Sequence, residues 1–482
     1  MSSLRAVVGL EVHVQLSTRT KLFSRSPSLS LPPNESVSPL DAAHPGVLPL
    51  LSTQAVKLAI RSALLLNCEV NRASSFDRKH YFYADMPAGY QITQQASPIA
   101  KKGRFDFHLL NENEELIKTV EVLQIQLEQD SGKSIHEEKE SLIDLNRSGC
   151  ALVEIVTAPE LSSGLEAASF VRQLRLLFMH HGISNGLMHK GQMRVDANVS
   201  ISNEKWNGQR TEIKNMNSIA DVESAIEYEI NRQKEIVKRG DKVIFETRTV
   251  DTQGRTVCMR EKAKTDYRFM HEPNIPTLRI SDSFMNESVL NVRSTTPLYK
   301  KLISDCGFSP KSAVHMSEDE DLSLFISHCC EKGNGMDSLP SIGGNLFMEW
   351  MLEMKQLCQR RRINYPPTRT GFHREFLTLI RLTRDANITR LTAIDVLREL
   401  IETDMMIEVE KFVNDNTLWR ILDEIEMERE AKIVLEGWTD NEKKKASIGH
   451  KKRRLKLRNE LIARSGKRID VDDAMKTIER LL

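Results

Sequence analysis

A carboxylate and an imidazole lie on the same face of a predicted strand near the start of the chain. The segment from Ala6 to Leu16 reads A-V-V-G-L-E-V-H-V-Q-L, and from Leu10 onward apolar and polar residues alternate. This alternation is typical of a half-buried strand. Neighbours on one face of a strand are roughly 6–7 Å apart, so Glu11 and His13 are candidates for one metal or acid–base site. The competing interpretation is a solvated strand face, because charged residues on sheet faces usually contact water.

Four further segments, at 120–130, 152–156, 193–201 and 211–214, alternate in the same way and carry a carboxylate on the polar face. Glu154 is the most informative of these acids, because it interrupts the apolar run L-V-E-I-V. Burying a carboxylate is costly unless it is paired or binds a metal. If these strands belong to one sheet, their acids form a cup for a hard cation such as Mg²⁺. The candidate acids, one from each segment, are Glu128, Glu154, Asp196 and Glu212.

Length and composition limit the class of protein. A chain of 482 residues predicts two to four domains, and 40% hydrophobic with 28% charged residues is typical of a soluble globular protein. No apolar run is long enough for a transmembrane helix. The seven cysteines show no C-x-x-C spacing, which argues against a structural zinc site and favours reduced thiols inside a cell. The first strand begins so early that we expect no signal or transit peptide in the chain as given.

The distribution of strand and helix signals predicts three regions. Residues 1–295 are rich in strand signals and contain two helices, one after the capping box at Ser163–Glu166 with a stop at Gly182, and one over about 220–239 with a stop at Gly240. Antiparallel strands with segregated helices predict an α+β fold. Residues 296–400 contain helical stretches, for example 313–332 and 346–362, and residues 401–482 are helical and strongly charged.

Positive charge is concentrated near the C-terminus. Between Lys443 and Arg468 there are twelve Lys or Arg residues and one acid, Glu460, although the net charge of the whole chain is only +1. Such an asymmetry favours a tail that binds a polyanion, and nucleic acid is the preferred ligand. The alternative is a solvated helical face.

Two other motifs bear on phosphate and base binding. The run D-S-G-K-S at 130–134 ends like a phosphate-binding loop, but the required first glycine is Leu127, so the motif fails. Lys133 remains a candidate phosphate ligand or a surface lysine. The aromatic and polar stretch 76–95 predicts a pocket wall for a nucleotide or an RNA end, with core anchoring as the alternative. The His180-His181 pair is interpreted as a helix C-terminus rather than a ligand pair.

Taken together, these segments resemble the B subunit of the glutamyl-tRNA(Gln)/aspartyl-tRNA(Asn) amidotransferase. The matching blocks occur in the family's order and cover most of residues 7–275, and a further match lies at I-A-R-S-G-K (462–467). The blocks are V-G-L-E-V-H-V-Q-L (8–16), F-D-R-K-H-Y-F-Y-A-D (76–85), Y-Q-I-T-Q (90–94), D-S-G-K-S with S-L-I-D-L-N-R-S-G (130–149), L-V-E-I-V (152–156), M-R-V-D-A-N-V-S (193–200) and E-I-K-N-M-N-S (212–218).

The resemblance implies a β-rich cradle with a kinase site, a helical domain and a small helical tail that binds tRNA. It implies ATP- and Mg²⁺-dependent phosphorylation of the side-chain carboxylate of Glu misacylated on tRNA(Gln), followed by amidation with ammonia. The implied partners are an amidase (glutaminase) A subunit and a small C subunit. Phosphoryl transfer relies on electrostatic positioning by metal ions, which agrees with the acidic cup.

Residue roles follow from the same resemblance. Expected metal ligands are Glu11, His13, Glu128, Glu154, Asp196 and Glu212, of which Glu11, His13 and Glu154 are also assigned to catalysis. Expected nucleotide- or phosphate-binding residues are Lys133, Asn198, Lys214 and Asn215.

The sequence departs from the family pattern in two places. Gln129 stands where the family commonly has an acid, which predicts the loss of one carboxylate ligand or its replacement by an amide oxygen. The segment Asp266–Pro273 keeps only the frame of the family's D-Y-R-Y-F-x-E-P. Gln129 supports an alternative, a non-catalytic tRNA-binding scaffold with a decayed cup. A stand-alone metal-dependent hydrolase is a third hypothesis, disfavoured by the basic tail. The divergent helical region predicts a mitochondrial member.

Overall fold

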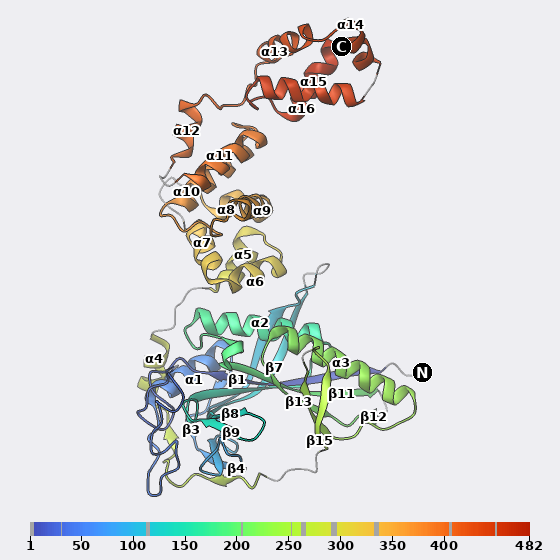
Figure 1. The fold of residues 1–482 in the computed structure, drawn as a ribbon. Coiled ribbons are helices and arrows are strands. Elements are labelled where there is room, and N and C mark those ends of the chain that lie inside the picture. The colour runs from blue at the N-terminus through green and yellow to red at the C-terminus, as the bar shows by residue number, and fades with distance from the viewer. Residues whose placement is uncertain are drawn as a thin grey trace. The chain divides into compact units, whose positions relative to one another are not determined.

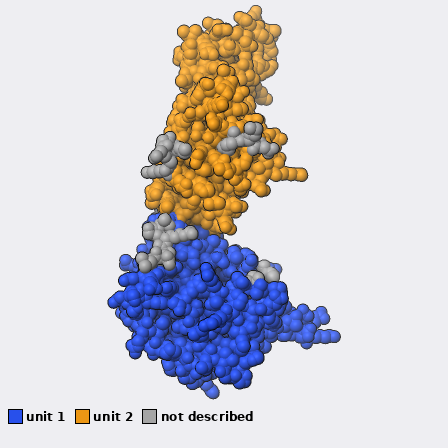
Figure 2. All heavy atoms as spheres, turned by 90° about the vertical axis from the view of Figure 1, so that its left-hand side faces the viewer, with its two compact units in different colours: residues 1–297 blue, residues 298–482 orange. Residues whose placement is uncertain are grey.

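Alternating strands near the N-terminus assemble into one large sheet in the computed structural model (Figure 1). The structure describes residues 4–29, 31–111, 116–203, 206–251, 253–261, 267–290, 296–331, 337–403, 407–448 and 451–482. The chain divides into two compact units, residues 1–297 and 298–482, coloured blue and orange in Figure 2. The first unit contains the sheet, and the second is helical among its described residues.

The first unit holds all the strands of the described chain and four helices. The strands are β1 (Arg5–Gln15), β2 (Glu69–Val70), β3 (Ala73–Ser74), β4 (Asp77–His80), β5 (Tyr90–Thr93), β6 (Ala100–His108), β7 (Ile117–Gln129), β8 (Lys133–His136), β9 (Ser141–Asp144), β10 (Ala151–Thr157), β11 (Met193–Asn203), β12 (Trp206–Asn207), β13 (Thr211–Met216), β14 (Glu246–Val250), β15 (Thr256–Glu261), β16 (Met270–His271) and β17 (Leu278–Arg279). The helices are α1 (Thr53–Leu65), α2 (Gly164–His180), α3 (Ile219–Lys238) and α4 (Asp282–Leu290).

The main sheet has β1 near its middle. In the described residues its order is β15-β14-β13-β11-β1-β10-β7-β6-β2, with β12 paired to β11. All neighbours are antiparallel except β13 and β14, which are parallel. The mixed helix and strand content and the antiparallel-rich sheet confirm the predicted α+β class. The parallel pair corrects the purely antiparallel expectation: α3, which lies between the two strands in sequence, returns the chain to the same end of the sheet.

The strand β1 separates an apolar face of the sheet from a polar face. On β1, Val8, Leu10, Val12 and Val14 are buried in the core, whereas Glu11 and His13 point to the opposite face. Helices α2 and α3 contact each other and lie across the apolar face (Figure 1). The polar face is thereby left free to build a site.

Capping residues fix the ends of these helices. The Ser163 side chain accepts a hydrogen bond from the Glu166 backbone N–H at the start of α2, and Gly182 follows the end of that helix with φ +64°. Both features confirm the prediction. In a capping box the Glu166 carboxylate would also accept a hydrogen bond from the backbone N–H of Ser163. Here it accepts from the backbone N–H of Ser162 instead. His181 is the C-terminal cap of α2, as interpreted from sequence.

The second unit contains helices only, within its described residues. They are α5 (Leu298–Cys306), α6 (Pro310–Glu318), α7 (Glu320–Cys330), α8 (Leu339–Ile342), α9 (Gly344–Arg361), α10 (Phe372–Arg384), α11 (Arg390–Glu402), α12 (Val409–Asp415), α13 (Glu424–Glu436), α14 (Asp440–Ser447), α15 (Lys451–Arg464) and α16 (Val471–Leu481).

The predicted helix over 313–332 was wrong in one respect. It is two helices, α6 and α7, because the Asp319 side chain caps the backbone N–H of Leu322 and starts a new helix there. Lys332, at its predicted end, lies outside the described residues. The helix predicted over 346–362 corresponds to α9. The further division of this unit at residue 400 stays a prediction. No helix in the described ranges is long and apolar enough to cross a membrane.

Candidate functional site

Strand register brings the predicted acids together on the polar face of the sheet. His13 of β1 lies opposite Glu154 of β10, and Glu11 lies opposite Asp196 of β11. Directly opposed side chains in an antiparallel pair are about 5 Å apart, so the two side chains of each pair can bind the same metal ion. The strands that flank these three, β7 and β13, supply Glu128 and Glu212.

His13 is the hub of this arrangement. Its Nδ1 is 2.8 Å from Glu128 Oε1, and its Nε2 is 4.0 Å from Asp196 Oδ2. Two groups of potential metal ligands share this histidine, and the ligand atoms within each group lie within 4.8 Å of one another. One group is Glu11, His13 and Asp196, and the other is His13, Glu128 and Glu154.

The acids perturb each other and the histidine. Burial lowers the pKa of His13, but the adjacent Glu128, Glu154 and Asp196 outweigh it and raise this pKa from 6.5 to about 9. Burial and the charge of Glu128 raise the pKa of Glu154 to about 7. For Glu128 itself, burial opposes ionisation, yet contact with His13 holds its pKa below the usual value. Crowded carboxylates of this kind are stabilised by positive charge.

A lysine and two asparagines complete the cup. Lys214 Nζ lies 3.1 Å from Asp196 Oδ2 and 3.0 Å from Glu212 Oε1. Burial lowers the pKa of Lys214, but these two carboxylates raise it well above its usual value. The backbone N–H of Asn215, a residue with φ +60°, donates to Asp196 Oδ1 at 2.9 Å. The Asn198 side chain donates to Glu11 Oε1 at 3.0 Å, so it orients a candidate ligand.

The cup opens into a cavity of about 1950 Å³ in the first unit. Six predicted residues line this cavity, whereas Glu11, Glu154, Glu212 and Asn198 do not. Glu11 and Glu154 lie close to His13, Glu212 contacts Lys214, and Asn198 contacts Glu11. Lys133 lines it from the start of β8 and is exposed. The lining set comprises His13, Glu128, Lys133, Asp196, Lys214 and Asn215.

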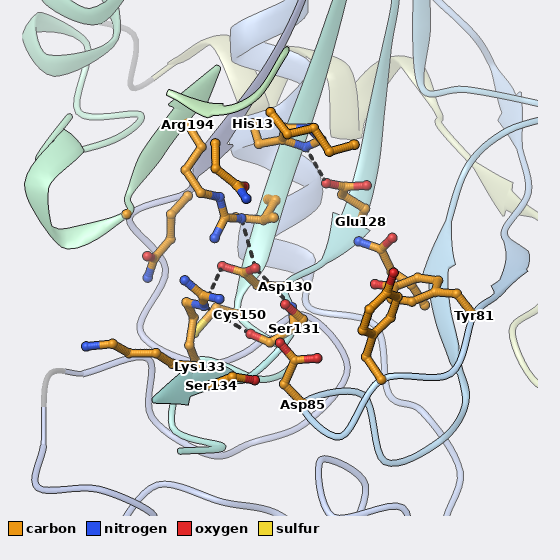
Figure 3. Close-up of a pocket in the computed structure, with 18 of the residues that line it drawn as sticks. His13, Tyr81, Asp85, Glu128, Asp130, Ser131, Lys133, Ser134, Cys150 and Arg194 are labelled. Carbon is orange, nitrogen blue, oxygen red and sulfur yellow. Dashed lines mark hydrogen bonds and ion pairs between the residues drawn. The ribbon is translucent and has the colours of Figure 1, made fainter. Parts of the chain in front are cut away.

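Three residues with no predicted role also belong to the site. Arg194 Nη2 donates to Asp130 Oδ1 at 2.8 Å, and Arg147 Nε lies 3.6 Å from Asp130 Oδ2. Figure 3 shows Arg194 and Asp130 facing each other below the contact between His13 and Glu128. Asp130 Oδ2 is buried and has no hydrogen-bond partner among the described residues. The signal for Arg194 was present, because it shares the polar face of β11 with Asp196.

The first departure from the family pattern lies outside the cup. Gln129 does not line the cavity, and its side-chain nitrogen lies 3.9 Å from the sulfur of Met86. The Gln129 amide therefore does not enter the cup, because along β7 the side chain next to Glu128 projects to the other side. The loss of one carboxylate ligand stays a prediction. In the second departure, Asp266 lies outside the described residues, whereas 267–270 line the cavity.

The predicted pocket wall from 76–95 is confirmed as a wall. Lys79, Tyr81, Asp85 and Gln91 all line the cavity, and Tyr81 lies across from Glu128 in Figure 3. Burial raises the pKa of the Tyr81 phenol above its usual value.

The donor set fits a hard divalent cation. Glu11, Glu128, Glu154 and Asp196 offer carboxylate oxygens, the preferred ligands of Mg²⁺. His13 Nδ1 is engaged with Glu128, so this imidazole also serves to position an acid.

The chain is similar to known proteins over most of its first unit. Residues 6–286 match the family described as the GatB/GatE catalytic domain. The B subunit of mitochondrial glutamyl-tRNA(Gln) amidotransferase from Danio rerio is 50% identical over 286 residues, which are 58% of this chain and 52% of the relative. The Homo sapiens protein of the same name is 49% identical over 287 residues, with 58% and 52% covered. The matches thus span about half the length of these two relatives.

A bacterial relative matches over nearly its whole length. The B subunit of aspartyl/glutamyl-tRNA(Asn/Gln) amidotransferase from Thermotoga petrophila is 36% identical over 451 residues, which are 90% of this chain and 89% of the relative. The acids, the histidine and the cavity described above all lie within the matched catalytic region. The chain therefore belongs to the GatB/GatE amidotransferase subunit family.

Proposed function

We propose that this chain is the kinase subunit of a tRNA-dependent amidotransferase. It uses ATP and Mg²⁺ to phosphorylate the side-chain carboxylate of Glu misacylated on tRNA(Gln), and ammonia then displaces phosphate to give Gln-tRNA(Gln). The observation that carries the proposal is the pair of ligand groups sharing His13, which lie at the edge of a large cavity lined by both acids and cations.

Phosphoryl transfer to a carboxylate requires positioning and charge stabilisation from the protein rather than a covalent intermediate. A glutamate side chain is already ionised at neutral pH, so it attacks the γ-phosphorus without a strong general base. The acids around His13 are the proposed Mg²⁺ ligands, and a metal bound there would neutralise the phosphate charge that repels the attacking carboxylate. Glu11, His13 and Glu154 are the residues proposed to act in catalysis, His13 by holding Glu128 in place.

Cations on the cavity wall are proposed to hold phosphate. Lys133 lines the cavity and is exposed, so its ammonium is available to a phosphate. Lys214 and Asn215 keep Asp196 oriented, and Asn198 does the same for Glu11. Arg147 and Arg194 add two guanidinium groups on the same wall.

The partners and compartment are part of the proposal. The relatives are named as the B component of a larger enzyme, which supports a complex with other subunits, proposed to be an amidase A subunit that supplies ammonia and a small C subunit. Two relatives are named mitochondrial, which supports a mitochondrial location. The tail, residues 401–482, is proposed to bind tRNA, while residues 1–295 form the kinase cradle and 296–400 a connecting helical domain.

Not all of the positive charge in the tail is available for RNA. Arg453, Arg464 and Lys467 form ion pairs with Glu442, Glu430 and Asp395 from other helices. Four exposed lysines of α14 and α15 are the proposed RNA contacts; they are Lys444, Lys445, Lys451 and Lys452.

The competing hypothesis is a non-catalytic tRNA-binding scaffold. It rested on Gln129, and that residue contacts Met86 rather than the cup. The five acids and His13 remain together, which favours the catalytic proposal.

The test is ATP turnover by the full chain co-expressed with its proposed amidase and C-type partners. Turnover is measured without tRNA, with uncharged tRNA(Gln) and with Glu-tRNA(Gln), for the wild type, Glu154→Gln and Glu121→Gln. Glu121 is an exposed glutamate on β7 outside the cavity and serves as the matched control. We expect turnover only with Glu-tRNA(Gln), lost in Glu154→Gln and kept in Glu121→Gln. Tight tRNA binding without aminoacyl-dependent turnover would instead support the scaffold.

A further inference from the structure

Large apolar side chains are exposed at the mouth of the cavity. Phe82 is 87% exposed, Tyr83 55%, Phe269 41% and Met270 50%, and all four line the cavity. We call the three aromatic residues, Phe82, Tyr83 and Phe269, the aromatic rim. Exposed aromatic surface gains nothing from folding, and a cluster beside a charged cavity is typical of a binding site.

The rim is built on a defined frame. β16 pairs with β4, and the His80 backbone N–H donates to the Tyr267 carbonyl at 3.0 Å, which joins the two segments that carry the rim. Within each segment the aromatic rings pack edge to face, Tyr81 with Tyr83 and Tyr267 with Phe269.

A glycine supports the most exposed ring. An added Cβ at Gly89 would lie 3.1 Å from Phe82 Cε1, so the edge of the Phe82 ring packs directly against this glycine. Gly89 has φ +72°, a conformation that favours glycine. The turn thus holds the ring while leaving most of it open to solvent.

The rim and the cup differ in burial. Glu128 is 2% exposed and Asp196 6%, whereas every rim side chain exceeds 40%. A ligand that contacts both must extend from the buried acids to the surface. A small nucleotide can bind without spanning this distance. An amino acid esterified to an unpaired RNA end spans it, because its side-chain carboxylate can lie at the buried acids while the preceding nucleotides lie at the exposed rim.

Cations stand beside the aromatic rings. Lys79 Nζ lies 4.9 Å from the centre of the Tyr267 ring, and Arg268 lines the cavity between Tyr267 and Phe269. Rings for bases and cations for the phosphates between them are the two elements of single-stranded nucleic-acid binding.

Resting on the proposed function, we infer that the aromatic rim stacks the unpaired bases at the 3′ end of the aminoacylated tRNA and so positions the side-chain carboxylate of the amino acid in the cup. Phe82 is a positioning residue in this inference, because it acts on the RNA and not on the reacting atoms. Loss of one stacking side chain typically weakens binding by about 5- to 100-fold.

The first experiment is independent of catalysis. The full chain with its partners is mixed with tRNA(Gln) that carries fluorescent 2-aminopurine in place of its 3′-terminal adenine. Stacking on the rim quenches this fluorescence. We expect quenching with the wild type and with Phe82→Trp, none with Phe82→Ala, and unchanged quenching with Tyr228→Ala, an exposed aromatic on α3 outside the cavity. Absence of quenching in the wild type, or its persistence in Phe82→Ala, would overturn the inference.

The second experiment separates RNA from the other ligands. In aminoacyl-dependent ATP turnover, Phe82→Ala is expected to raise KM for Glu-tRNA(Gln) at least about 5-fold while KM for ATP stays within about twofold. A rise in KM for ATP would make the rim a nucleotide site, and reduced co-purification of the amidase would make it a protein-docking surface; either overturns the inference. Quenching without any turnover in the wild type would refute the proposed function and leave the rim standing.

Discussion

Lys214 neutralises two acids of the cup, and its removal gives a quantitative test. Replacing Lys214 with Met removes a cation that lies 3.1 Å from Asp196 and 3.0 Å from Glu212. Each contact is a charge-assisted hydrogen bond that contributes about 1.5–3 kcal/mol, and losing one member of a buried pair costs about 3–5 kcal/mol. The Lys214 side chain is 29% exposed, so water replaces part of the interaction. We therefore expect a loss of about 3 kcal/mol in the free energy of unfolding.

The assay is thermal unfolding with and without Mg²⁺. A loss of about 3 kcal/mol lowers Tm by about 6 °C in a unit of this size. In the variant, Asp196 and Glu212 lack a cation, so bound Mg²⁺ relieves more repulsion than in the wild type. We expect millimolar MgCl₂ to raise the Tm of Lys214→Met by several degrees more than that of the wild type, and EDTA to abolish the difference.

The control is Lys102→Met, which removes an exposed lysine 3.5 Å from Glu69. Surface pairs of this kind contribute at most about 1 kcal/mol, so its Tm should remain close to that of the wild type at any Mg²⁺ concentration. The reasoning is refuted if Lys214→Met is as stable as this control, or if Mg²⁺ stabilises all three proteins equally.

Three further perturbations concern charged groups outside the cup. Asp41→Asn removes the negative charge 2.8 Å from the fully buried Lys21 ammonium and should cost about 3–5 kcal/mol in urea unfolding. Replacing Lys21 with Met and Asp41 with Leu together should cost less, and equal losses would contradict this. Burial opposes ionisation of Glu229, but hydrogen bonds from Arg232 and Gln233 hold its pKa below 4.5. The ionised Glu229 carboxylate therefore stabilises the fold fully above pH 4.5, and this stabilisation is lost as the pH falls through the lowered pKa. Glu229→Gln should have a lower free energy of unfolding at pH 7, and its stability should not show this loss in acid. Charge reversal of the four tail lysines proposed to contact RNA should weaken tRNA binding and flatten its salt dependence. Reversal of Lys101 and Lys102 on β6 is the control, and equal effects would argue against a tail-borne site. The four are Lys444, Lys445, Lys451 and Lys452.

The alternation of apolar and polar residues predicted the strands of the site well. All five alternating segments are strands, and each candidate acid is on the polar face, because a period of two is a local property of the chain. The contacts between acids were not predictable in the same way. That His13 bonds Glu128, two strands away, depends on sheet order and register, which only the whole fold determines.

Charge in the tail illustrates the same limit. The window from Lys443 to Arg468 contains one acid, yet Arg464 and Lys467 pair with Glu430 and Asp395, which lie far outside it. Sequence counting finds charge in a segment but not the partners that other helices bring to it. The break at Asp319 was missed for a simpler reason, since a capping side chain outcompeted a continuous apolar stripe.

The place of β1 in the sheet has a consequence for how the chain is made. Among the strands of the main sheet it comes first in the sequence, but its neighbours β10 and β11 follow only after β2, β6 and β7. His13 and Glu128 are 115 positions apart, and Glu11 and Asn198 are 187 apart. At about 5–20 residues per second, β1 waits roughly ten seconds or longer before its partners exist. During that time its apolar face is a target for aggregation or for chaperones, and no truncated chain that stops before β11 can hold a complete cup.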